Sequence, residues 1–261
     1  FEDDSLATAR VVADDVDNDD NADSLIYEWL SVPTRGQFDD LGNGAFQFDP
    51  AGEFSELAAG EQASEVLVYR VTDSHGASSQ ANLTITVTGK NSLPVVEDDS
   101  YDGDSDSVLM ITAPGLLGND QDGDVSDILT VVNSGSQSSS LGAAVSIAAD
   151  GSFSYDPTAV TAFRNLSFGE FLDDDFGYSV TDGIGNTTGQ VTVRVAGVND
   201  APAADDYLLL LSEDDSLATA RVVAGDVDND DNADSLIYEW LSLPTRGQFD
   251  DLGNGELDDH R

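Results

Sequence analysis

The sequence predicts an all-β chain made of tandem antiparallel β-sandwich domains. Short runs alternate apolar with polar residues, clusters of Gly, Asn, Asp and Ser separate them, and one long segment occurs twice. Alternation with a period of two indicates strands that bury one face. Residues 2–44 recur as residues 213–255 with two substitutions, Gly225 for Asp14 and Leu243 for Val32. Near-identity at such a distance is typical of a tandem array.

The alternating runs give the order of the expected strands. In the first part of the chain they cover residues 25–30, 67–72 and 83–88. The turn residues Asp73–Gly76 between the last two runs predict a hairpin. In the middle of the chain we expect strands at 128–132, 152–155, 176–180 and 191–195, with a turn at 182–186 before the last one.

Two prolines mark the expected domain boundaries, because Pro94 and Pro202 each follow a short polar stretch that ends a β run. Residues 1–92 then form a sandwich whose entry strand is missing, and residues 93–201 form a second sandwich. Residues 202–261 hold only the first half of a repeat of domain 1. A half sandwich leaves its core open, so residues 202–255 either pair with the 46–89 region of another copy in a domain swap or form a partly collapsed tail.

The net charge of the chain limits the classes of partner that it can bind. It carries 52 acidic against 9 basic residues, a formal net charge of −43, so the compact state repels itself unless cations neutralise it. With 39% hydrophobic residues in strand-like runs, we expect a folded chain neutralised by metal and not a disordered one. The charge excludes nucleic acid, and no apolar stretch is long enough for membrane insertion. The absence of cysteine excludes zinc–thiolate sites and disulfides.

Three acidic loops of one design are the candidate metal sites. Each has carboxylates at alternate positions and one more aspartate just before a strand: Asp15, Asp17, Asp19 and Asp23; Asp120, Asp122, Asp124 and Asp127; Asp226, Asp228, Asp230 and Asp234. Calcium takes about six to eight oxygen ligands, and alternate side chains of a tight loop converge on one point. Asp73, Asp182 and Glu213 lie in turns or domain starts that could approach these loops. The alternative is a solvated acidic surface.

At this point the motifs resemble known repeats of large bacterial surface proteins. The middle of the chain resembles their cadherin-like repeats in the segments Leu116–Asp124, Asp150–Pro157, Phe176–Gly183 and Gly197–Pro202. The first domain is similar to VCBS repeats in the segments Leu57–Glu61, Tyr69–Asp73 and Leu83–Gly89. The third segment repeats the VCBS-like beginning.

The resemblance implies calcium-dependent Ig-like/cadherin-like sandwiches in secreted adhesins of the RTX type, located outside the cell or on the bacterial surface. It carries ligand roles onto Asp120, Asp122, Asp124 and Asp182, and by analogy onto the equivalent aspartates of the first loop and hairpin. It also implies ligands at the second junction, Asn199 and Asp200. The first junction has Asn91-Ser92 there, so a calcium ion at that place lacks one carboxylate.

The predicted function is that of a structural extender or cell-adhesion segment that binds Ca²⁺, with polysaccharide or other copies of itself as further partners. The alternative is a calcium-dependent carbohydrate-binding module, which needs exposed aromatic residues. Trp29 and Trp240 share the phase of core residues, which leaves Phe163, Phe168 and Phe171 as candidates. No enzyme activity is expected, because His75 lies in a turn and His260 lies near the end of the chain.

Overall fold

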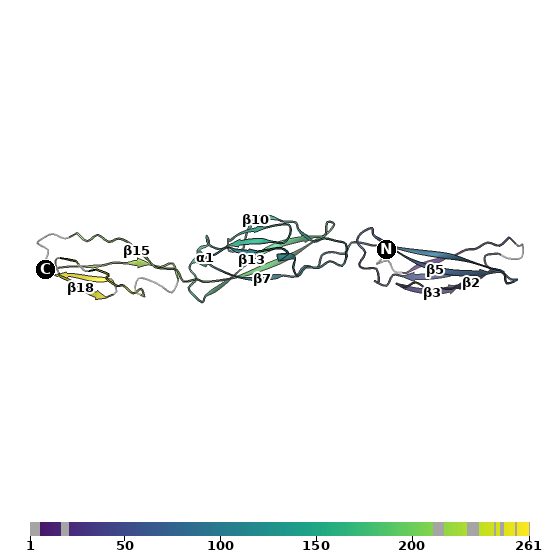
Figure 1. Cartoon of the computed structure of the whole chain (residues 1–261), viewed down its shortest axis with the longest axis horizontal. Coiled ribbons are helices and arrows are strands. Elements are labelled where there is room, and N and C mark those ends of the chain that lie inside the picture. Colours follow the sequence, from purple (N-terminus) through teal and green to yellow (C-terminus); the bar gives the residue numbers. More distant parts are fainter. Residues whose placement is uncertain are drawn as a thin grey trace. The chain divides into compact units, whose positions relative to one another are not determined.

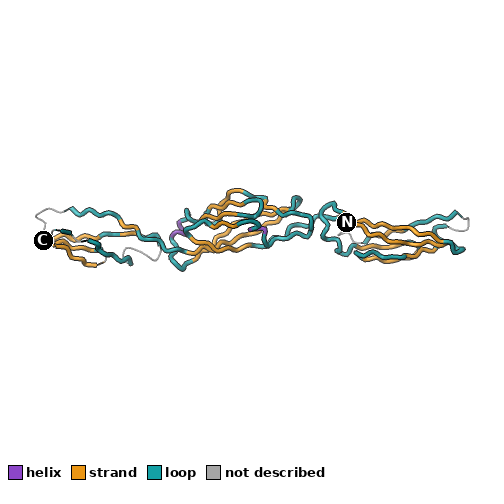
Figure 2. Tube along the Cα trace, viewed as in Figure 1, coloured by secondary structure: helices purple, strands orange, loops and turns teal. Residues whose placement is uncertain are grey.

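The computed structural model describes residues 6–16, 21–210, 217–228, 235–242, 244–245, 248–253 and 255–260. Their fold is all-β, which confirms the predicted fold class (Figure 2). The helices of this part are a single turn of α-helix, α1 (Thr161–Arg164), and a 3-10 turn, η1 (Gly115–Leu117). Among the described residues, no helix has the length and apolar character needed to cross a membrane. The chain forms two compact units, residues 1–97 with 117–132 and 179–189, and residues 98–116 with 133–178 and 190–261.

The N-terminal part of the first unit contains two three-stranded antiparallel sheets, ordered β1-β4-β3 and β2-β5-β6 (Figure 1). The strands are β1 (Ala7–Arg10), β2 (Ile26–Trp29), β3 (Gln37–Gly42), β4 (Ala45–Asp49), β5 (Gln62–Thr72) and β6 (Ser78–Thr88). The predicted hairpin is confirmed, because β5 and β6 pair from Gln62↔Thr88 to Thr72↔Ser78. The acidic turn that starts at Asp73 therefore lies at the end of a long ribbon.

Aromatic side chains fill the core between these sheets. Phe48, Phe54 and Val87 are buried, and Phe38, Leu57, Ala63 and Ile85 pack against them. The Trp29 ring lies 5.0 Å from Phe38 and 5.5 Å from Tyr69, measured between ring centroids. Trp29 is thus a core residue, as its phase with Leu25 predicts.

The middle of the chain forms two four-stranded sheets, ordered β10-β11-β12-β8 and β7-β14-β13-β9. Their strands are β7 (Asp99–Asp104), β8 (Leu109–Ile111), β9 (Thr130–Val131), β10 (Gly135–Ser138), β11 (Ala144–Ile147), β12 (Phe153–Asp156), β13 (Phe171–Thr181) and β14 (Asn186–Ala196). The pair β7–β14 is parallel, a departure from the antiparallel pattern of the pairs around it. The strand expected at 128–132 is shorter than predicted and covers only β9.

Phe153 joins the two sheets, because its ring lies 5.1 Å from Tyr101 and 5.5 Å from Phe176 between centroids. Beside this core lies a fully buried carboxylate, Asp174. It accepts hydrogen bonds from the Tyr155 hydroxyl at 2.7 Å, from Ser140 Oγ at 2.7 Å and from the Leu141 amide at 2.9 Å. Burial opposes ionisation, but these bonds outweigh it and hold the pKa of Asp174 below its usual value.

The third segment repeats the strand pairing of the first. Its described strands are β15 (Ala203–Ala204), β16 (Leu217–Arg221), β17 (Ala224–Gly225), β18 (Gln248–Gly253) and β19 (Glu256–His260). The sheet β16-β19-β18 corresponds to β1-β4-β3, and the register Ala218↔Asp259 corresponds to Ala7↔Phe48. A separate pair, β15–β17, joins the linker to this segment. The predicted swap between copies stays a prediction.

Candidate metal centre

Three carboxylates of the second acidic loop come together in the first unit. Asp122, Asp124 and Asp127 each offer one oxygen, and these oxygens all lie within 4.8 Å of one another. The loop brings them together through its backbone, because the Asp124 amide donates to Asp122 Oδ1 at 2.9 Å and the Asp127 amide donates to the Asp124 carbonyl at 3.1 Å. We call these three residues the junction cluster. Asp124 is only 1% exposed.

The linker before this domain packs directly on the junction cluster. The Ser92 amide donates to Asp124 Oδ2 at 2.9 Å. The Asn91 side-chain amide donates to Asp182 Oδ2 at 2.8 Å and also to the Ser92 carbonyl. A Cβ at Gly123 would stand 3.0 Å from Ser92 Oγ, so a larger residue there would require the Ser92 side chain to shift by a few tenths of an ångström. Residues far apart in sequence thus meet at one place.

The cluster leaves oxygen atoms without donors. Asp122 Oδ2, Asp124 Oδ1, Asp127 Oδ2 and Asn91 Oδ1 are buried and accept no hydrogen bond from the described residues. Buried polar atoms in folded proteins nearly always have a partner, and carboxylates this close repel one another strongly. Three carboxylates and an amide carbonyl are hard oxygen donors of the kind that calcium prefers. The donor set therefore fits a hard divalent cation.

The pKa shifts of Asp127 and Asp182 reflect the burial of these carboxylates and their closeness to one another. Burial and then the charges of Asp124 and Asp122 raise the pKa of Asp127, with further contributions from Asp182 and Glu61. Burial would also raise the pKa of Asp182, but hydrogen bonds from Asn91 and from the amides of Ile184 and Gly185 lower it overall. Asp182 is therefore an ionised anchor for the linker. The raised pKa of Asp127 reflects its burial and the negative charges gathered around it.

The third acidic loop meets the second linker in the same way, within the second unit. The Asp200 amide donates to Asp228 Oδ2 at 2.9 Å, and the Asp228 amide donates to Asp226 Oδ1 at 3.0 Å. The Asn199 side chain donates to the Asp200 carbonyl at 2.7 Å, as Asn91 does to Ser92. Asp228 is 4% exposed. The linker has a carboxylate at this point, where the first linker has the Ser92 hydroxyl.

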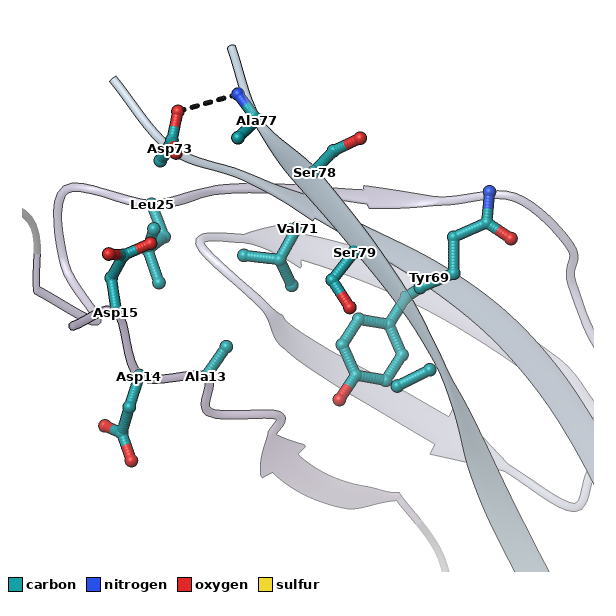
Figure 3. Close-up of a pocket in the computed structure, with 12 residues that line it drawn as sticks. Ala13, Asp14, Asp15, Leu25, Tyr69, Val71, Asp73, Ala77, Ser78 and Ser79 are labelled. Atoms are coloured by element: carbon teal, nitrogen blue, oxygen red, sulfur yellow. Dashed lines mark hydrogen bonds between the residues drawn. The ribbon is translucent and has the colours of Figure 1, made fainter. Parts of the chain in front are cut away.

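A hollow opens beside Asp15, at the start of the first acidic loop. Asp15 and Asp73 line it, and its volume is about 320 Å³ (Figure 3). Asp73 Oδ1 accepts the amides of His75 at 2.8 Å and Ala77 at 2.9 Å, which shapes the hairpin turn. Asp23 lies apart in an ion pair with Arg10 at 2.9 Å.

Of the remaining predicted ligands, the structure describes one, and the other five lie outside the described residues. Asp120 Oδ1 accepts the Glu97 amide at 3.0 Å, next to the junction cluster in sequence. Asp17, Asp19, Glu213, Asp230 and Asp234 lie outside the described residues and stay predictions.

The sequence-based ligand set omits three residues of the first junction, Asn91, Ser92 and Glu61, although the motif comparison placed Asn91-Ser92 opposite Asn199-Asp200. The signal for Asn91 is its equivalence to Asn199, since both stand two residues after a glycine. The signal for Glu61 is the pair Gly60-Glu61, which recurs as Gly169-Glu170. In both pairs the glutamate accepts a backbone amide three residues before it, at 3.1 Å for Glu61 and 3.0 Å for Glu170. A comparison of the two modules would have found them.

The candidate aromatic surface lies in the second unit. Phe163 is fully buried, whereas Phe168 is 82% and Phe171 is 57% exposed. The Arg194 guanidinium lies 5.5 Å from the centre of the Phe171 ring. The prediction of carbohydrate binding therefore depends on Phe168 and Phe171 and stays a prediction.

Comparisons with known families agree with this architecture. Residues 91–197 match the family model described as a bacterial cadherin-like domain, and residues 1–86 match the model described as a bacterial Ig domain. No curated protein matches the chain. The chain therefore contains cadherin-like and Ig-like repeats. The VCBS assignment of the first domain stays an interpretation of its motifs.

A solved structure with a TM-score above 0.5 has a similar fold. The chain is similar to mouse cadherin-23 EC22-24 with a TM-score of 0.51 and 14% identity, covering 94% of this chain and 78% of that one. It is also similar to protocadherin gamma B2 domains 3-6, with a TM-score of 0.46 and 16% identity over 91% of this chain. The protocadherin gammaB4 extracellular domain gives 0.47 and 14% over 100% of this chain. The chain spans 60% and 47% of these two protocadherin structures.

Proposed function

We propose that the chain is a calcium-binding tandem β-sandwich segment of an extracellular bacterial adhesin, where it acts as a structural extender or in cell adhesion. The observation that carries the calcium assignment is the group of buried oxygen atoms without donors on Asn91, Asp122, Asp124 and Asp127. The bacterial assignment is supported by the family models, whose descriptions name bacterial cadherin-like and Ig domains. The extracellular assignment extends the resemblance of the sequence motifs to repeats of secreted adhesins.

The residues of the first junction would hold the ion between them. The junction cluster would supply three carboxylates and Asn91 an amide carbonyl. Asp182 and Glu61 stand close enough to act on the charge of Asp127. The ion itself would supply positive charge that removes the repulsion among these groups.

The role of the protein residues is to fix the linker. Asn91 is held by Asp182 from the β13–β14 turn, and Ser92 is held by Asp124 from the acidic loop. A ligand that binds only the folded state stabilises it by about 2.7–4.1 kcal/mol at 100 to 1,000 times its dissociation constant. Calcium would therefore both stabilise the fold and restrict motion of the linker.

A thermal melt followed by circular dichroism tests the proposal, first in excess EDTA, then in millimolar calcium, with magnesium as control. We expect calcium to raise the Tm markedly and magnesium to raise it little, since magnesium demands a small octahedral site. The variant Asp122→Asn should lose most of this shift, whereas Asp39→Asn, an exposed residue of β3, should keep it. An equal Tm in EDTA and calcium would contradict the proposal.

The second candidate function, a calcium-dependent carbohydrate-binding module, rests on the exposure of Phe168 and Phe171. A polysaccharide pull-down in calcium and in EDTA separates the two. An extender retains no polysaccharide in either condition. A binding module retains it in calcium and loses it in the double variant F168A/F171A.

A further inference from the structure

The glycine that follows the last strand of the first module packs against a turn of the same module. This residue is Gly89, directly after β6. A Cβ added to it would stand 2.3 Å from the Ala58 carbonyl oxygen and 2.4 Å from the Leu57 carbonyl oxygen. These atoms belong to the backbone and not to the end of a flexible side chain. Any larger residue at this position must therefore displace the turn.

The turn against Gly89 carries Glu61. The Glu61 amide donates to the Ala58 carbonyl at 2.9 Å, and the Glu61 carboxylate accepts the Ala58 amide at 3.1 Å. The Gly89 amide donates to the Glu61 carbonyl at 2.8 Å. The carbonyl that a Cβ on Gly89 would displace is therefore the same one that holds Glu61 in place.

The cadherin-like module repeats this arrangement around Gly197, directly after β14. A Cβ added to Gly197 would stand 2.3 Å from the Ser167 carbonyl oxygen, which accepts the Glu170 amide at 3.0 Å. The Gly197 amide donates to the Glu170 carbonyl at 2.9 Å. The two modules match different family models, yet both have these contacts at nearly the same distances. The recurrence indicates a role that the two modules share.

Each glycine also lies close to a junction, because the linker asparagine follows it by two residues. At the first junction, the charge of Glu61 is one of those that raise the pKa of Asp127. The Glu61 carboxylate thus acts on the junction cluster from the first module. A carboxylate beside a bound cation adds to its attraction even when it is not a ligand, and groups outside the ligand shell commonly tune metal affinity.

We propose that Gly89 and Gly197 are positioning residues for the cation sites of the two junctions. Each acts through the glutamate of its turn, Glu61 or Glu170, by holding that carboxylate close to the ion. The inference rests on the proposed function, because without a cation the added negative charge would only increase the repulsion at the junction. Calcium affinity then depends on a residue that has no side chain of its own.

A calcium titration followed by NMR tests this role, because the amide signals of Ser92 and Asp200 report the two junctions separately. Glu61→Gln removes the charge but keeps an oxygen for the turn amide, and we expect it to weaken the first junction about tenfold. Gly89→Ala should weaken it by a similar factor and leave the second junction unchanged. The matched control Gly103→Ala should leave both unchanged, since the nearest atom to a Cβ there is at 3.8 Å.

The double variant G89A/E61Q separates positioning from a general loss of structure. If Gly89 acts through Glu61, the double variant binds calcium no more weakly than Gly89→Ala alone. Independent effects would multiply to about a hundredfold, and that result would overturn the inference. The variants Gly197→Ala and Glu170→Gln make the same cycle at the second junction.

Glu61→Asp decides the question if Gly89→Ala does not fold. It keeps the charge but draws the carboxylate back by one methylene, so we expect it to weaken the first junction as Glu61→Gln does. An affinity equal to that of the unchanged protein would show that the position of the carboxylate does not matter, and the inference would be overturned.

The outcomes also separate this inference from the proposed function. If calcium shifts both amide signals and neither Gly89→Ala nor Glu61→Gln changes the affinity, the inference is overturned and the calcium assignment stands. If calcium shifts neither signal, the proposed function fails and the inference fails with it. An equal loss at both junctions in Gly89→Ala would also overturn the inference, because the glycine would then act on the fold as a whole.

Discussion

Two buried carboxylates of this chain, Asp174 and Asp124, have opposite surroundings. Asp174 receives hydrogen bonds from Tyr155, Ser140 and Leu141, all within its own unit. Asp124 receives the Ser92 amide on one oxygen, while its other oxygen lies buried beside Asp122 and Asp127 without a donor. The chain supplies donors to both oxygens of Asp174 but leaves one oxygen of Asp124 without a donor. Burial of an acid thus indicates a metal site only where the donors are missing.

The largest expected effect comes from Asp174→Ala. It leaves the Tyr155 hydroxyl and the Leu141 amide without their acceptor in the core, and we expect a loss of about 3–5 kcal/mol in the free energy of unfolding. The loss should be the same in EDTA and in calcium, measured by chemical denaturation. The control Asp173→Ala removes an exposed ion pair with Arg194 and should cost less than about 1 kcal/mol. A loss seen only in calcium would mean that Asp174 acts as a metal ligand, and the contrast with Asp124 would fail.

Asp124→Ala should behave in the opposite way. In calcium we expect it to remove about 3–4 kcal/mol of ion-linked stability. In EDTA the loss should be much smaller, because the change also removes repulsion within the junction cluster. Calcium titrations followed by thermal melts measure both values. Asp228→Ala makes the matched change at the second junction, and equal losses in EDTA and calcium for both variants would mean that these acids act like Asp174.

Ser92→Asp gives the first linker the carboxylate that Asp200 gives the second. The Ser92 side chain lies against Gly123 of the acidic loop, so the added charge would face the proposed ion. We expect about tenfold tighter calcium binding at this junction, or about 1.4 kcal/mol, measured by isothermal titration calorimetry. The reciprocal Asp200→Ser should weaken the second junction by a similar factor. No change in either affinity would show that the linker residue does not face the ion.

The smallest expected effect is a pH dependence set by Asp174. Its pKa is lower in the folded state than in the unfolded state, so the unfolded chain binds the proton more tightly. Its contribution to stability is therefore present above the ordinary aspartate pKa and is lost as the pH falls through the folded pKa, with a slope of at most about 1.4 kcal/mol per pH unit. Denaturation in EDTA between pH 5 and about pH 2 measures the slope. Asp174→Asn should reduce it, and an unchanged slope would assign the dependence to other acids.

Local patterns predicted much of the fold. Alternation placed Leu67 and Val87 on buried faces, and the turn residues after Thr72 predicted the hairpin. The parallel pairing of β7 with β14 lay beyond such reasoning, because it joins strands far apart in sequence with no turn between them.

The candidate site, too, could be predicted only in part from the sequence. The spacing of Asp122, Asp124 and Asp127 indicated one loop with converging side chains, and the structure brings these three together. The part played by Asn91 could not be predicted from its neighbours, since its amide contacts Asp182, 91 residues away. A single polar residue in a linker forms no recognisable sequence motif. Only the second copy of the linker, with Asn199, makes its recurrence visible.

The repeated segment also affects how a tandem array of this kind can evolve. Residues 2–44 and 213–255 are followed by different strands, β4 with Phe46 and Phe48 at its core and β19 with Leu257 and Asp259 at the same register positions. Because both strands pair identically with the segment before them, the register is set by the shared segment and its glycine turn. Recombination between two copies within this segment would therefore join a new downstream half to the existing upstream half without changing the strand register.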